Sequence, residues 1–155
     1  MTDHSDHTPA GSGLTRLAVT ATVHCLTGCA IGEVLGLVVA TALGWGNLAS
    51  IVLAVALAFV FAYGLTLLPM LRSGLAFGAA LGIAFAADTV SIATMEVVDN
   101  AVVLLVPGAM DAGLSRGLFW GSLVVSLAVA IVVTVPVNRA LIARGKGHAV
   151  AHAHH

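Results

Sequence analysis

Four long apolar runs dominate the sequence, and their lengths decide what kind of fold the chain can adopt. The runs cover residues 17–43, 48–68, 75–106 and 118–137, and the breaks between them are rich in glycine, proline and polar residues. An α-helix needs about 20 apolar residues to cross the hydrocarbon core of a bilayer, so every run is long enough. The sequence therefore predicts an all-α integral membrane protein built as a four-helix bundle.

Composition supports a membrane fold and argues against other classes of protein. Hydrophobic residues make up 59% of the 155 residues, charged residues make up 8%, and the mean hydropathy is +1.07. Soluble domains carry about 25% charged residues. No basic stripe with interleaved aromatic residues occurs, so we expect no nucleic-acid partner. We expect the lipid bilayer to be the main partner of the chain.

The chain divides into three parts by polarity. Residues 1–13 form a polar N-terminus that we expect to be disordered, residues 14–144 form the four-span membrane domain, and residues 145–155 form a histidine-rich tail. Proline residues predict where helices end. Pro69 and Pro107 predict the ends of the second and third helices, and Pro136 predicts a kink or an end in the fourth.

The basic residues predict the orientation of the bundle. In a four-span arrangement Arg116 falls on one side. The other five basic residues fall on the opposite side: Arg16, Arg72, Arg139, Arg144 and Lys146. Cytoplasmic loops carry the excess of Lys and Arg, so both termini are expected in the cytoplasm, in a bacterial inner membrane. Trp45 and Trp120 then lie at the outer interface, where aromatic residues gather.

Soft and ionisable side chains lie in the middle of the first run. They are His24, Cys25, Cys29 and Glu33, and the run contains no Lys or Arg to neutralise the carboxylate. An ionisable group at membrane depth costs at least about 2.5–3.5 kcal/mol, so such residues are functional candidates. Thiols and imidazoles bind soft transition metals. The four residues predict a metal site, with Cu(I) favoured over zinc; a thiol redox role or simple core packing of the cysteines is the alternative.

The spacing of the small residues predicts how the first run packs. Cys25 and Cys29 lie one turn apart, with Cβ atoms about 5–6 Å apart, whereas a disulfide needs about 3.5–4.5 Å. We therefore expect free thiols. Gly28, Gly32 and Gly36 follow the same face, and such steps let another helix approach closely. We expect this face to hold the cysteines against the third run, although packing alone also explains the glycines.

A second polar stripe follows one face of the third run. Its members are Asp88, Ser91, Met95, Glu96 and Asp99. Carboxyl groups without a basic partner at membrane depth are either protonated or receive a cation, so the stripe predicts a pathway for protons or cations. Protonated carboxyls that hydrogen-bond between helices are the alternative. The second and fourth runs have no charged residue in their cores and are predicted to act as scaffold.

Three motifs together resemble a known family. They are the HCxxGCxxGE motif at 24–33, the segment 88–96, and the segment 136–139 that closes the fourth run. The combination resembles a bacterial family of small membrane proteins that carries only a domain-of-unknown-function label, the 4396 series, over residues 15–148. The resemblance implies the membrane fold and brings no activity. The first motif is also similar to the soft-ligand spans of small copper importers and mercury-uptake proteins, but it lacks MxxxM and its cysteines are not vicinal.

Histidines also occur at both ends of the chain. They are His4, His7, His148, His152, His154 and His155. Neutral imidazoles bind copper or zinc, so the C-terminal tail is either a weak acceptor of metal or a solvated segment.

The sequence as a whole predicts a membrane protein that binds and transports a soft transition-metal ion, with copper favoured, through a bundle interior of Cys, His and carboxylate groups. A membrane thiol/proton redox protein is one alternative. A non-catalytic assembly subunit is the other, with a second copy or a partner membrane helix docked on the glycine face. We favour a role that is not enzymatic.

Overall fold

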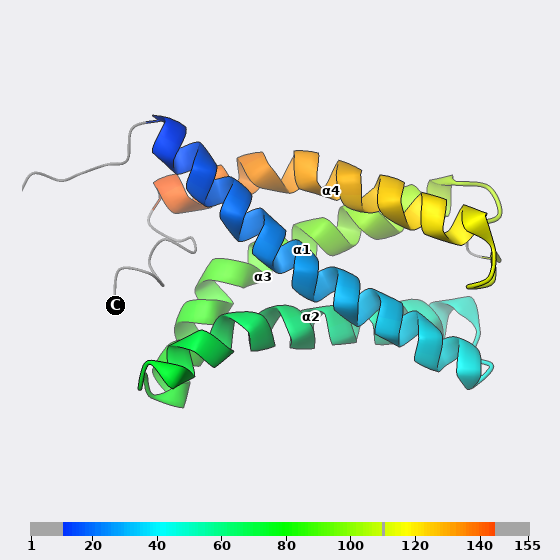
Figure 1. Ribbon diagram of the computed structural model, residues 1–155, viewed down its shortest axis with the longest axis horizontal. Coiled ribbons are helices and arrows are strands. Elements are labelled where there is room, and N and C mark those ends of the chain that lie inside the picture. Colours follow the sequence, from blue (N-terminus) through cyan, green and yellow to red (C-terminus); the bar gives the residue numbers. More distant parts are fainter. Residues whose placement is uncertain (1–10, 110, 145–155) are drawn as a thin grey trace, which may run out of the picture.

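The computed structural model describes residues 11–109 and 111–144, and this part of the chain consists of helices without strands. The four helices are α1 (Gly11–Ala42), α2 (Asn47–Arg72), α3 (Phe77–Leu105) and α4 (Gly117–Ala143). Successive helices run in opposite directions, and α1 crosses the bundle between α2 and α4 (Figure 1). Each helix is long and apolar enough to span a membrane. The predicted all-α four-helix membrane bundle is confirmed.

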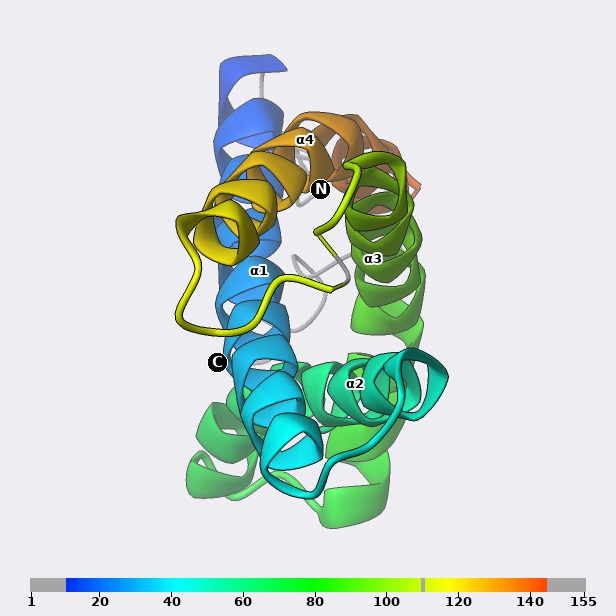
Figure 2. The same ribbon diagram turned by 90° about the vertical axis from the view of Figure 1, so that its right-hand side faces the viewer.

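The two ends of the bundle differ in the residues that they carry. We call one the basic end; it holds Arg16, Arg72, Arg139 and Arg144. We call the other the tryptophan end; it holds Trp45 and Trp120 together with Arg116, and it faces the viewer in Figure 2. The connection between α3 and α4 crosses the tryptophan end (Figure 2).

Two prolines lie inside helices rather than at their ends. α2 continues through Pro69 to Arg72, and α4 continues through Pro136 to Ala143. Both helices are longer than the sequence predicted. Membrane helices tolerate proline where neighbouring groups form hydrogen bonds with the backbone groups that the proline leaves unpaired. Pro107 does follow the end of α3 at Leu105, as expected.

The first helix also begins earlier than predicted. Residues 11–13, which we expected in the disordered N-terminus, form the first turn of α1. Residues 1–10 and 145–155 lie outside the described part of the chain. The terminal histidines therefore lie outside it as well: His4, His7, His148, His152, His154 and His155.

The glycine face of α1 packs against α2. A Cβ atom added at Gly28, Gly32 or Gly36 would lie within 3.0 Å of α2 backbone atoms. The α2 residues that it would meet are Ala62, Ala58 and Ala54, which repeat at the same four-residue interval. We expected the glycines to hold α1 against α3. That expectation is wrong, because the helix that the glycines contact is α2. The complementary alanine stripe makes α2 the helix that can approach most closely.

The outer surface of the bundle is apolar. Large side chains point away from the interior on all four helices, with Leu48 77%, Val97 70% and Val132 73% exposed. Polar and charged side chains are buried instead, which is the reverse of a soluble protein. This inside-out distribution fits a multi-pass protein whose helices contact lipid.

Candidate functional site

Buried polar side chains form a column along the inside of the bundle. The carboxyl groups of the column belong to Glu33 on α1 and to Asp88, Glu96 and Asp99 on α3, and each residue is at most 5% exposed. We call the whole set the polar column. From the basic end to the tryptophan end its members are Thr22, Asn138, Cys25, Asp88, Ser91, Cys29, Glu96, Glu33, Asp99 and Ser126.

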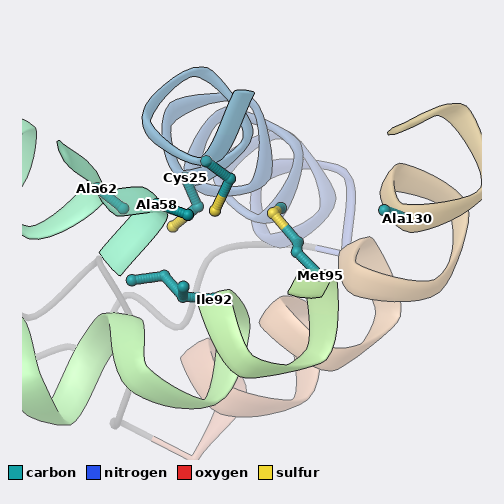
Figure 3. Packing of buried hydrophobic residues seen from close by; sticks show 7 residues of the cluster. Cys25, Ala58, Ala62, Ile92, Met95 and Ala130 are labelled. Carbon is teal, nitrogen blue, oxygen red and sulfur yellow. The ribbon is translucent and has the colours of Figure 1, made fainter. Parts of the chain in front are cut away.

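Three sulfur-containing side chains lie at the middle of the column. Cys25, Cys29 and Met95 are each at most 2% exposed and belong to one packed cluster. Figure 3 shows Cys25 of α1 and Met95 of α3 on facing sides of this cluster. Both cysteines are free thiols, as the spacing predicted. We call these three residues the sulfur cluster.

Carboxyl groups flank both thiols. The Cys25 thiol donates a long hydrogen bond to Oδ1 of Asp88, with 4.0 Å between the sulfur and the oxygen. Ser91 also lies beside Cys25, and Glu96 lies beside Cys29. The cysteine side of α1 and the acidic side of α3 therefore meet, as expected, even though the glycines pack elsewhere.

A second group of carboxyls lies one turn nearer the tryptophan end. Glu33 interacts with both Asp99 and Glu96, and Asp99 also interacts with Ser126. Four buried carboxyl oxygens find no hydrogen-bond partner of good geometry in the described part of the chain: both oxygens of Glu96, Oε2 of Glu33 and Oδ1 of Asp99. We call Glu33, Glu96 and Asp99 the carboxyl cluster. A buried, unpaired carboxylate is costly, so this cluster either holds protons or attracts a cation.

The carboxyl cluster borders a cavity of about 310 Å³ at the tryptophan end. Apolar side chains form much of its wall, among them Leu37, Trp45, Ile51, Phe119 and Leu123. Polar residues contribute the rest: Thr41, Asn47, Ser50, Asn100 and Ser122. None of the described residues that line the cavity is basic. The cavity is therefore an acidic chamber with a largely apolar wall.

His24 of α1 lies next to α2. Its Nε2 lies 3.3 Å from Oγ1 of Thr66, at the contact between α1 and α2. The structure thus brings Cys25 and Cys29 together with Met95, Asp88 and Glu96 and leaves His24 beside another helix. Among the described His, Cys, Asp and Glu side chains, no group of three is arranged so that it could hold a metal ion.

The fourth helix contributes polar groups that the sequence reasoning missed. Ser122, Ser126, Thr134 and Asn138 are all buried on the inner face of α4. Asn138 donates a hydrogen bond of 2.8 Å to Oγ1 of Thr22 and so links α4 to α1. The signal was present in the sequence, because these residues repeat at intervals of four or eight along an apolar run. The fourth run is therefore more than scaffold.

The comparisons with known proteins place the chain in a family without an assigned activity. No curated protein and no solved structure matches the chain. A family match covers residues 16–147, which include most of α1 and all of the other three helices. The chain belongs to the family described as Domain of unknown function (DUF4396).

Proposed function

We propose that the protein binds a soft transition-metal ion, with Cu(I) favoured, and passes it along the polar column. The observation that supports this most directly is the sulfur cluster, in which two thiols and one thioether from two helices share a buried site. Thiolate and thioether sulfur are the ligands that Cu(I) prefers. The ligands that we propose are therefore Cys25, Cys29 and Met95.

The surroundings of the thiols fit the chemistry that binding requires. A cysteine binds metal as the thiolate, so each ligating thiol must release a proton. Asp88 accepts the hydrogen bond from Cys25, and Glu96 lies beside Cys29. Each carboxylate is thus placed to take the proton that its thiol gives up. The metal ion then takes the place of those protons on the sulfur atoms.

The order of ligands along the column gives a route. An ion that enters at the tryptophan end first meets the oxygen atoms of Glu33, Glu96 and Asp99 and then the sulfur cluster. Asp88 and Ser91 lie beside Cys25, further toward the basic end. His24 faces Thr66, so we give it no ligand role in this arrangement.

The orientation follows from the distribution of charge. We propose that the basic end faces the cytoplasm, so that both termini are cytoplasmic and the cavity opens to the outer face of a bacterial inner membrane. The arginines at the basic end support this, because cytoplasmic ends of membrane helices carry the excess of basic residues.

Copper loading of the purified protein tests the proposal. The protein, in detergent under reducing conditions, is loaded with Cu(I), and bound copper is measured by mass spectrometry. The Cys25→Ser/Cys29→Ser variant should lose most of its copper, because Ser keeps a similar volume without the soft ligand. Met95→Leu should weaken binding, whereas Met70→Leu should not, since Met70 is buried in a different cluster. Equal copper in the double serine variant would contradict the proposal.

A further inference from the structure

The cavity at the tryptophan end is much larger than a metal ion needs. Its volume is about 310 Å³. Pockets that bind small organic molecules begin at about 300 Å³ and have mostly apolar walls with a few polar groups that fix orientation. The cavity matches that description in both size and lining.

The carboxyl groups of the cavity determine the sign of the charge that a ligand must carry. Glu33, Glu96 and Asp99 all line it, and each is at least nine-tenths buried. Among the described residues, neither oxygen of Glu96 has a hydrogen-bond partner of good geometry. An anion would be repelled, and a neutral apolar molecule would leave these oxygens unsatisfied. A cation with N–H donors neutralises the carboxyls and satisfies their oxygens at the same time.

The wall of the cavity selects the body of the ligand. Trp45 and Phe119 present aromatic surface, and Leu37, Ile51 and Leu123 add aliphatic surface. Aromatic faces attract organic cations, and apolar walls gain free energy when they are covered by apolar groups. A bare or hydrated metal ion would leave this surface without a partner.

We propose that the cavity binds a small amphipathic organic cation, a protonated amine with an apolar body. Its ammonium group lies against the carboxyl cluster, and its apolar part lies against Trp45 and Phe119. The sulfur cluster takes no part in this site, so the amine and the sulfur-bound metal ion have separate ligands, although the carboxyl cluster also lies on the proposed route of the ion.

A matched pair of ligands tests the charge requirement. Binding of 2-phenylethylammonium and of 2-phenylethanol to the purified full chain is measured by calorimetry at pH 7, where the amine is protonated. The two molecules share the ring and the chain and differ in the cationic group. The ammonium should bind at least tenfold more tightly than the alcohol. Equal affinities, or no binding of the ammonium, would overturn the proposal.

Variants of the cavity test its location. Glu96→Gln should weaken ammonium binding at least tenfold, and Ser50→Leu should do the same by narrowing the cavity without changing its charge. Asp111→Asn should have no effect, because Asp111 is an exposed acid of the α3–α4 connection that does not line the cavity. If Glu96→Gln fails to fold, Ser50→Leu decides the outcome. Full affinity in the folded cavity variants would overturn the proposal.

The double serine variant separates this site from the proposed metal function. Cys25→Ser/Cys29→Ser should bind the ammonium as the wild type does. Copper loss together with retained ammonium binding supports both proposals. Loss of ammonium binding in a folded double serine variant would overturn the independence of the cavity.

Discussion

Single side chains in the polar column are placed to handle protons as well as a metal ion. Asp88 is fully buried, and its Oδ1 accepts from the Cys25 thiol at 4.0 Å. An asparagine has the same shape and can still accept that hydrogen bond, but it cannot take a proton or carry a negative charge. The exchange of Asp88 for Asn therefore isolates the chemical role of this carboxyl from its packing.

We expect Asp88→Asn to fold normally and to bind Cu(I) at least about tenfold more weakly, since the variant lacks the carboxylate that takes the Cys25 proton and the site loses a negative charge. Helix content by circular dichroism and copper affinity by competition with a chelator are the measurements. The exposed acid Asp111, changed to Asn, is the matched control. Wild-type copper affinity in Asp88→Asn would contradict this role and would mean that Asp88 contributes only to packing.

Whole helices pair through stripes of small residues, and these stripes explain which parts of the fold could be predicted. The four apolar runs gave four spans, and the glycine stripe of α1 correctly indicated a close helix contact. The partner helix was missed because the matching stripe consists of Ala54, Ala58 and Ala62, which look like ordinary apolar residues in an alanine-rich run. The end of α2 was predicted too early because Pro69 and Pro107 look alike in sequence, yet the first lies inside a helix and the second follows one.

The candidate site, like the fold, has some features that the sequence predicts and others that it does not. A helical wheel is enough to place Cys25, Cys29 and Glu33 on one face and the acids of α3 on another. It does not say that His24 turns toward Thr66, because that direction depends on how α1 and α2 cross. The cavity was equally out of reach, since residues from all four helices and their connections line it.

The contact between α1 and α2 predicts opposite effects for two glycines. Gly32→Ala places a Cβ within 3.0 Å of the Ala58 backbone, and such overpacking costs about 1–3 kcal/mol. Gly64→Ala in α2 meets no atom within 4 Å, so it should leave stability unchanged or raise it by about 0.5–1 kcal/mol through helix propensity. Thermal unfolding in detergent measures both. A Gly32→Ala variant as stable as the wild type would contradict the close contact.

The molecule as a whole has one basic end and one end with tryptophans, and this polarity predicts its orientation in the membrane. Cysteine is introduced into the Cys25→Ser/Cys29→Ser variant at Ser73 of the basic end or at Ser115 of the tryptophan end; both serines are exposed. A membrane-impermeant maleimide added to intact cells should label the Ser115→Cys protein and spare the Ser73→Cys protein. The reverse pattern would invert the proposed orientation.

The glycine–alanine contact also has a mechanical consequence. Backbone meets backbone along three successive turns, so we expect α1 and α2 to stay together in any movement of the bundle. The polar column holds contacts of another kind, made by side chains: the Cys25 thiol meets Asp88 of α3, and Thr22 meets Asn138 of α4. Side-chain contacts of this kind can break and re-form while the close backbone contact between α1 and α2 is kept. If the protein opens to release a bound ion, we expect the side-chain contacts of the polar column to separate. The pair α1 and α2 would then move as a unit away from α3 and α4.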